Sequence, residues 1–232
     1  MRFKSLRAVA LMAFLVSNHA QAVTIPAGYD YFFTDPGSYF DFGSGIGVVN
    51  FKGETIGPGS TDTIVQRLSD ATINGPAIPI QITALSLVSV APVLGFGGIP
   101  VYISLDPNDL AQDTGTITIN GSESGGKFDS FFDVFFDVCV NPGENGVGCG
   151  GSPLLTGIHK KFTSSGSSWS PAPPPNAVNA SGDFFPTTVI HQTDVGEHVV
   201  AVAVTPIPST VWLLISSIGG LGVFPRMRRI TS

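Results

Sequence analysis

Apolar residues recur at every second position in several stretches of the chain, and this alternation limits the fold more than any other feature. Shorter alternating runs cover residues 99–105 and 116–120, and an apolar run rich in valine covers 199–204. A period of two is typical of strands that have one face in a core. The longest run lies between residues 78 and 90, where the apolar even positions are Ile78, Ile80, Ile82, Ala84, Val88 and Val90.

Turn signals separate these runs. The 28 glycines and 18 prolines among 232 residues argue against a helix-rich protein, because both residues are unfavourable inside helices. Proline-glycine pairs at 35–37, 57–59 and 141–143 mark turns. Many short strands with frequent turns predict an all-β fold, a single antiparallel β-sandwich or jelly roll. The uncharged stretch 162–182 is expected to be a long surface loop within that domain.

The charges are unevenly placed. All 17 acidic residues lie between residues 23 and 205, together with only five basic residues, so this part carries a net charge of −12. Binding to a polyanion requires Lys or Arg to replace the counterions of the phosphates. Five dispersed basic residues do not provide such a surface. The sequence therefore excludes nucleic acid as a partner.

The N-terminus has the pattern of a secretory signal peptide. Three basic residues precede an apolar stretch at 8–16, and Ala20 and Ala22 form a site for a signal peptidase. Nine apolar residues are too few to span a bilayer core of about 30 Å. We therefore expect residues 1–22 to be removed during export, so that the mature chain begins at Val23.

The C-terminus has the pattern of a short membrane segment. Residues 210–224 carry no charge, and Arg226, Arg228 and Arg229 follow them. Fifteen helical residues would extend about 22 Å, which is marginal for a transmembrane helix. Arginines beyond such a segment favour the cytoplasmic side. This pattern predicts a weakly inserted segment held in orientation by its arginines.

The whole tail, residues 205–232, resembles a known sorting signal. The order of Pro206, Ile207 and Pro208, an apolar segment and an arginine cluster is similar to the PEP-CTERM tails of Gram-negative bacteria, and most similar to the variant with the motif Val-Pro-Leu-Pro-Ala. Ile207 departs from the Glu of the commoner motif. The resemblance implies processing by an exosortase-like membrane enzyme and association with exopolysaccharide and biofilm. It says nothing about the fold of residues 23–204.

Cys139 and Cys149 are the only cysteines. Export places them in an oxidising compartment, where disulfides form and persist. The glycine-rich stretch between them is long and flexible enough for the two sulfur atoms to form a disulfide bond. A zinc site would need four ligands, and the sequence supplies neither a second cysteine pair nor a nearby histidine pair. We therefore predict a disulfide between Cys139 and Cys149.

Residues 128–140 have an apolar even face and an odd face that contains Asp129, Asp133 and Asp137. Two interpretations remain open: a cation site or binding ribbon on the odd face, or a buried strand whose carboxylates keep its second face hydrated. His191 and His198 flank a turn signal at 194–196, which would allow them to approach each other across a hairpin and hold a metal ion. His159 lies elsewhere. Because such scattered histidines are more often structural, we predict no metal site.

The function predicted from these patterns is that of an exported protein. The expected organisation is a signal peptide (1–22), a β-domain (23–204) and a sorting tail (205–232). No catalytic motif or cofactor site is evident, so the domain is expected to be non-catalytic, structural or adhesive, on a bacterial surface or in the extracellular matrix. The alternative is a carbohydrate- or calcium-binding module, and a secreted hydrolase comes third. Clustering of exposed aromatic residues with acids would favour the binding module; the candidates are Tyr29, Tyr31, Tyr39 and Trp169.

Overall fold

The structure is a computed structural model that describes residues 23–178 and 183–205. The predicted signal peptidase site at Ala20 and Ala22 lies outside the described residues. So do the sorting motif, Pro206, Ile207 and Pro208, and the basic cluster, Arg226, Arg228 and Arg229. Within the part that is described, no helix is long and apolar enough to cross a membrane.

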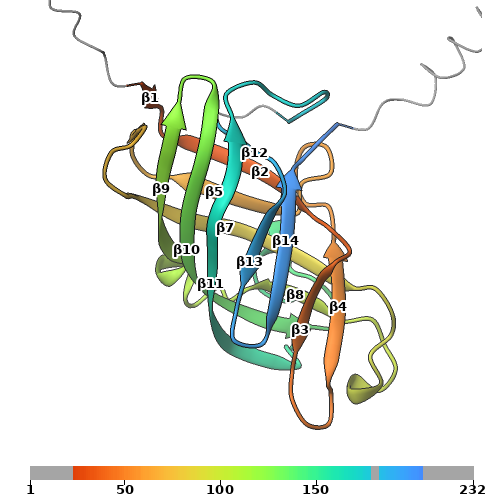
Figure 1. Cartoon of the computed structure of the whole chain (residues 1–232). Helices are drawn as coiled ribbons and strands as arrows, with labels where there is room; N and C mark the ends of the chain where they lie inside the picture. Colours follow the sequence, from red (N-terminus) through yellow and green to blue (C-terminus); the bar gives the residue numbers. More distant parts are fainter. Residues whose placement is uncertain (1–22, 179–182, 206–232) are drawn as a thin grey trace, which may run out of the picture.

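Strands dominate the described residues, which confirms the all-β prediction (Figure 1). Three single 3-10 turns interrupt them: η1 (Leu94–Phe96), η2 (Leu110–Gln112) and η3 (Glu144–Gly146). The strands are β1 (Thr24–Ile25), β2 (Gly28–Thr34), β3 (Ser38–Asp41), β4 (Val48–Gly53), β5 (Thr63–Arg67), β6 (Ala71–Thr72), β7 (Ile78–Ser89), β8 (Tyr102–Leu105), β9 (Thr114–Ser122), β10 (Gly125–Cys139), β11 (Leu155–Ser170), β12 (Phe185–Pro186), β13 (Val189–Gln192) and β14 (Gly196–Val202).

Three pairs of strands lie end to end along one neighbour. β2 and β3 both pair with β14, β4 and β5 both pair with β7, and β8 and β9 both pair with β10. Each pair therefore forms one long strand that is interrupted at mid-height, by residues 35–37, 54–62 or 106–113. These interruptions do not reverse the chain.

The long strands follow one another around a closed antiparallel barrel of eight strands. Their order is β2/β3, β4/β5, β7, β8/β9, β10, β11, β13 and β14, and β14 pairs back onto β2. A barrel of this kind needs no second sheet to cover its apolar face, because the sheet closes on itself. The β-sandwich or jelly roll expected from the sequence is therefore not confirmed, and the observed architecture is an up-and-down barrel.

An even number of antiparallel strands brings the chain back to the end at which it started. β1 and the last residue of β14 accordingly lie at the same end of the barrel (Figure 1), here called the terminal end. The opposite, distal end carries the β3–β4 turn, the β7–β8 loop, the loop after β10 and the β13–β14 turn. The terminal half and the distal half of the barrel interior are filled differently.

The distal half of the barrel is filled by phenylalanines. The ring of Phe40 lies 5.8 Å from that of Phe51, 6.0 Å from Phe136 and 5.7 Å from Phe162, measured between centroids. All four side chains are buried. They come from β3, β4, β10 and β11, so they tie opposite walls of the barrel together. This cluster leaves the terminal half as the part of the interior where a cavity remains.

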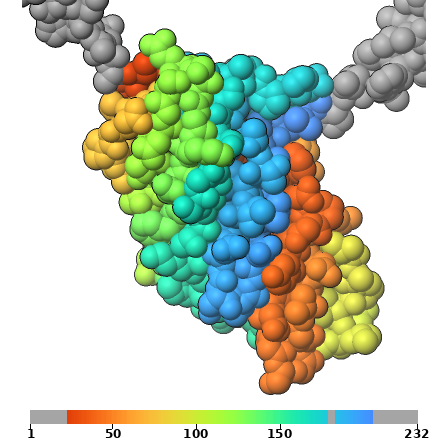
Figure 2. Space-filling model, viewed as in Figure 1, coloured from red at the N-terminus to blue at the C-terminus, as the bar shows by residue number. Residues whose placement is uncertain are grey.

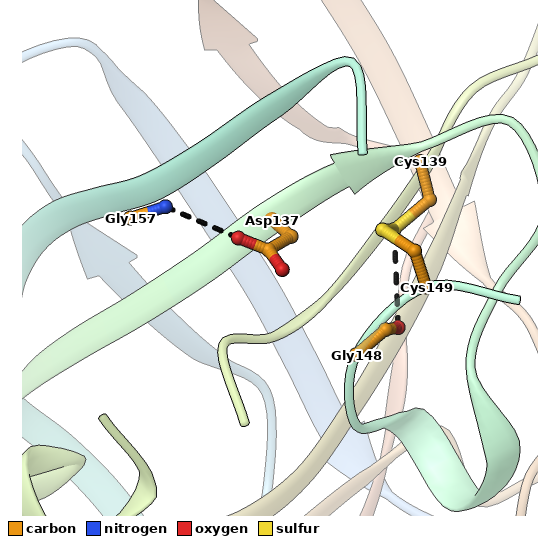
Figure 3. Close-up of a disulfide and its surroundings, with 5 residues drawn as sticks. All are labelled: Asp137, Cys139, Gly148, Cys149 and Gly157. Carbon is orange, nitrogen blue, oxygen red and sulfur yellow. Dashed lines mark hydrogen bonds between the residues drawn. A yellow bond between two sulfur atoms is a disulfide. The ribbon is translucent and has the colours of Figure 1, made fainter. Parts of the chain in front are cut away.

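A disulfide joins Cys139, the last residue of β10, to Cys149 in the loop that leads to β11 (Figure 3). Cys139 is fully buried, and the Gly148 carbonyl oxygen lies 3.8 Å from its sulfur. The Gly148 amide donates to the Leu105 carbonyl at 2.7 Å, which attaches the loop to β8. The disulfide therefore fastens the distal loop after β10 against the barrel wall.

Candidate functional site

A cavity of about 50 Å³ lies inside the terminal half of the barrel. Residues of β2, β5, β7, β9, β10, β11, β13 and β14 line it, and most of them are phenylalanine, isoleucine or valine. A few polar side chains interrupt this lining: Asp30, Thr63, Arg67, Ser130, His191 and His198. Ligand sites in proteins commonly combine an apolar lining with a few convergent polar groups, so this cavity is the candidate site.

Two histidines face each other across the β13–β14 ladder. His191 and His198 occupy directly opposite positions, and their ring centroids are 6.4 Å apart. The two histidines therefore do meet across a hairpin, which the turn signal between them allowed. Burial lowers the pKa of His191 to about 4. Burial and the nearby His191 lower the pKa of His198 to about 3, so both rings are neutral at pH 7.

His198 is tied to a buried carboxylate through a threonine. The hydroxyl of Thr34 lies 2.9 Å from His198 Nε2 and donates to Asp62 Oδ1 at 2.6 Å. Because that hydroxyl has only one proton, Nε2 of His198 must carry the proton that it shares with Thr34. We assign the Nε2–H tautomer on this basis. Its Nδ1 is then a bare acceptor, and it makes no hydrogen bond with any residue that the structure describes.

Asp62 holds three long strands at mid-height. Its carboxylate also accepts the Thr34 amide at 2.6 Å and the Thr63 hydroxyl at 2.8 Å, and its carbonyl oxygen accepts the Ser86 amide at 2.9 Å. Any side chain at Gly53 would overlap this carboxylate. Burial raises the pKa of Asp62 to about 6, and the hydrogen bonds from Thr34 and Thr63 oppose the rise. This group is a structural anchor next to the cavity.

An ion pair closes the terminal end of the cavity. Arg67 of β5 binds Asp30 of β2, and the side chains are 1% and 11% exposed. The Arg67 Nε–H donates to the Pro26 carbonyl at 3.3 Å, and the guanidinium lies 5.4 Å from the ring centroid of Phe184. Burial raises the pKa of Asp30 to about 6 despite the opposing charge and hydrogen bond of Arg67. The pair satisfies its own charges, which a buried pair requires.

Ser130 and His191 resemble a nucleophile and a base, with the Ser130 hydroxyl 3.4 Å from His191 Nε2. A general base works best when its pKa is near the operating pH, and the pKa of His191 is about 4. Among the described residues no carboxylate hydrogen-bonds to the other ring nitrogen to orient the imidazole. The arrangement is therefore better suited to holding a molecule than to activating a serine.

The odd face of β10 uses its carboxylates to bind β11. Asp129 accepts the Ser165 hydroxyl at 2.8 Å and the Gly166 amide at 2.7 Å. Asp137 accepts the Gly157 amide at 3.1 Å (Figure 3). Both glycines sit at φ +63°, where β11 bulges. These contacts favour the interpretation of residues 128–140 as a structural strand over a cation site, although Asp137 is itself buried.

The third carboxylate of this face, Asp133, also contacts a residue of β11. Asp133 lies 3.0 Å from Nε2 of His159 on β11. The His159 ring stacks on Phe135 with centroids 4.4 Å apart, and the ammonium of Lys161 lies 4.4 Å from the Phe131 ring. In the part of the chain that the structure describes, no three His, Cys, Asp or Glu residues are arranged to hold a metal ion.

The four aromatic candidates are dispersed. Trp169 is buried and donates to the Asn120 carbonyl at 3.0 Å, so it belongs to the core. Tyr29 and Tyr31 lie on the outer face of β2. Only Tyr39 lies among acids, in a shallow groove at the distal end that also contains Asp41, Asp194 and Glu197. The clustering with acids that would favour a binding module is therefore seen for Tyr39 but not for the other three candidates.

The sequence did not indicate the ion pair or Asp62. Arg67 did carry a usable signal, because it shares the alternate positions of a strand with Thr63 and Val65, which are buried. An arginine on the apolar face of a strand requires a buried partner. Asp62 had no such signal, since it follows a glycine- and proline-rich stretch that is typical of an exposed turn.

Comparison of the chain with protein-family models, with curated proteins and with solved structures finds no match. The function of the barrel is therefore inferred from its own residues.

Proposed function

We propose that this chain is an exported protein of the cell surface or extracellular matrix of a Gram-negative bacterium, with a non-catalytic structural or adhesive barrel. Its signal-peptide pattern and its tail similar to PEP-CTERM signals support export and sorting. The disulfide fits an oxidising compartment. The proposed partners are an exosortase-like membrane enzyme, which acts on the tail, and exopolysaccharide.

The single observation that best supports this proposal is that both ends of the described chain lie at the terminal end of the barrel (Figure 1). A precursor held in a membrane by its tail would then have its distal end directed away from that membrane. Processing near Pro208 would release the mature protein outward without disturbing the barrel. Such an arrangement suits a domain that makes its contacts through the distal end.

The distal end offers apolar side chains for such contacts. Val48 is 59% exposed, Val90 52% and Leu94 89%. The β3–β4 turn and the β7–β8 loop pack on each other, with the Phe42 and Phe96 rings 6.3 Å apart. Figure 2 shows the two segments, orange and yellow, side by side at the lower right. Neither of these segments, residues 42–49 and residues 90–101, contains a charged residue.

The test is a fractionation and attachment experiment in an exosortase-containing host. The full chain is expected at the cell surface or in the matrix without its tail, and Leu94→Ser is expected to weaken its retention there. Leu68→Ser is the matched control, because Leu68 is also exposed (45%) but follows β5 at the terminal end. Equal retention of both variants would argue against distal contacts, and a chain left in the cytoplasm would argue against export.

The alternative function is a carbohydrate- or calcium-binding module. The observation that favours it is the groove of Tyr39, Asp41, Asp194 and Glu197. A glycan array and a calcium titration of the mature protein test it directly. Binding that Tyr39→Ala or Asp41→Asn abolishes would support the module.

A further inference from the structure

The cavity in the terminal half has the size of a very small molecule. A water molecule needs about 10–15 Å³ of such space, so a cavity of about 50 Å³ accommodates roughly three to five atoms larger than hydrogen. The lining is mostly apolar, and water in such surroundings finds few partners. The occupant best matched to this lining therefore has a short apolar body.

The polar atoms of the cavity define what the occupant must offer. Arg67 and Asp30 bind each other, so they do not require a charged ligand. The Thr34 contact leaves Nδ1 as the bare acceptor of His198, which is one of the residues that line the cavity. A neutral imidazole acceptor is complemented by a hydroxyl donor. An ion would lose its hydration without gaining a partner of opposite charge.

The barrel wall has few backbone hydrogen bonds between β11 and β13, the strand that carries His191. β11 and β13 share one ladder position, Thr163 opposite Gln192. The next backbone bond between these segments runs from the Thr187 amide to the Ser168 carbonyl. Between them β11 bulges at Ser165 and Gly166, which Asp129 holds from outside. A small molecule can therefore reach the interior with little disruption of the ladder.

We propose that this cavity binds a short-chain alcohol, or an equally small neutral hydroxyl compound, whose hydroxyl donates to Nδ1 of His198 while its carbon chain contacts the phenylalanine-rich lining. The Ser130 hydroxyl of β10, which also lines the cavity and lies 3.4 Å from His191 Nε2, supplies a second polar partner. This binding goes beyond the proposed surface function and does not depend on it.

The test is a titration of the mature protein, 15N-labelled at histidine, with 1-butanol and with its isomer methyl propyl ether. The two probes have the same atoms, but only the alcohol donates a hydrogen bond. We expect a saturable shift of the His198 Nδ1 resonance with the alcohol and about fivefold to tenfold weaker binding of the ether. No saturable binding of the alcohol, or equal affinity for the two isomers, would overturn the proposal.

Two variants and a control locate the site. His198→Phe removes the acceptor and should weaken alcohol binding to the level of the ether. Val65→Leu keeps every hydrogen bond and fills part of the cavity, so it should abolish binding even if His198→Phe folds poorly. His159→Phe changes a histidine on the outside of β11 and should leave the affinity unchanged. Unchanged binding in Val65→Leu would place the alcohol elsewhere and contradict the proposal.

Discussion

At the scale of single residues, Asp113 is the least well satisfied charge in the described part of the chain. It is fully buried, its Oδ1 accepts the Phe135 amide at 2.6 Å, and its Oδ2 has no partner there. Burial raises its pKa to about 7, and the negative charges of Asp109 and Asp106 add to the rise. A carboxyl group with a raised pKa binds its proton more tightly in the folded state than in the unfolded state.

This arrangement predicts that Asp113→Asn stabilises the protein at high pH. The contribution of Asp113 to the stability of the wild type falls as pH rises from about 4 through 7, because the unfolded state gives up this proton first. The amide never ionises, so the variant should gain about 1–3 kcal/mol at pH 8 and little at pH 4. Urea unfolding at both pH values measures the difference. Glu123→Gln, in an exposed turn, is the control, and a gain independent of pH would contradict the prediction.

The histidine pair predicts the opposite pH dependence. His191 and His198 have lowered pKa values of about 4 and 3, so unfolding takes up protons between about pH 6.5 and these values, and stability falls on acidification. Comparison with His191→Phe isolates this effect, because the buried aspartates are common to both proteins. In urea unfolding, the free energy of unfolding of His191→Phe relative to that of the wild type should rise by about 2 kcal/mol when the pH is lowered from 7 to 4. A constant difference would refute the assignment.

At the scale of elements, the disulfide fastens the loop between β10 and β11. Replacing both cysteines by serine should lower the free energy of unfolding by about 2.5–3 kcal/mol, because the unfolded chain regains the entropy of a short loop. Denaturant unfolding measures this loss. Reduction of the wild type should produce the same change, and identical midpoints for oxidised and reduced protein would contradict it.

Individual strands were more predictable than their arrangement. The period-two runs located β7, β8 and β9, and the apolar even face of residues 128–140 is the inner face of β10. The interruptions at 35–37, 54–62 and 106–113 contain Asp and Pro, and the first two also contain Gly, as true turns do. The sequence alone does not distinguish an insertion within a long strand from a reversal between two strands, so the barrel was not foreseen.

β11 shows how tertiary contacts override local composition. Residues 162–170, rich in serine, were expected to begin a surface loop, yet they continue a strand to Ser170. Their partner β10 supplies the ladder, and Asp129 accommodates the bulge that serine and glycine allow. Strand propensity depends strongly on such neighbours. The histidine pair was predictable because its two members flank one short hairpin, whereas the ion pair joins strands far apart in sequence.

At the scale of the whole molecule, the barrel is expected to fold without the tail. Deleting residues 206–232 leaves the bond from the Thr205 amide to the Asn176 carbonyl intact, so the truncated chain should be exported and folded but released into the periplasm. Replacing Arg226, Arg228 and Arg229 with glutamine should lower processing of the full chain. Mass spectrometry of cell fractions tests both, with Val23 as the expected N-terminus. A mature surface protein that retains the tail would show a permanent anchor.

Closure of the barrel also limits how copies of this protein can join. Every described strand longer than two residues has a strand partner on both sides, but β11 shares only one ladder position with β13, so its first half is paired with β10 alone. Fibres built by inserting a strand of one subunit into the sheet of the next need a row of unpaired backbone donors and acceptors. Among the described strands, the first half of β11 is therefore the place where a strand of another copy could add, and elsewhere cross-links within a polymer network would have to form through side chains.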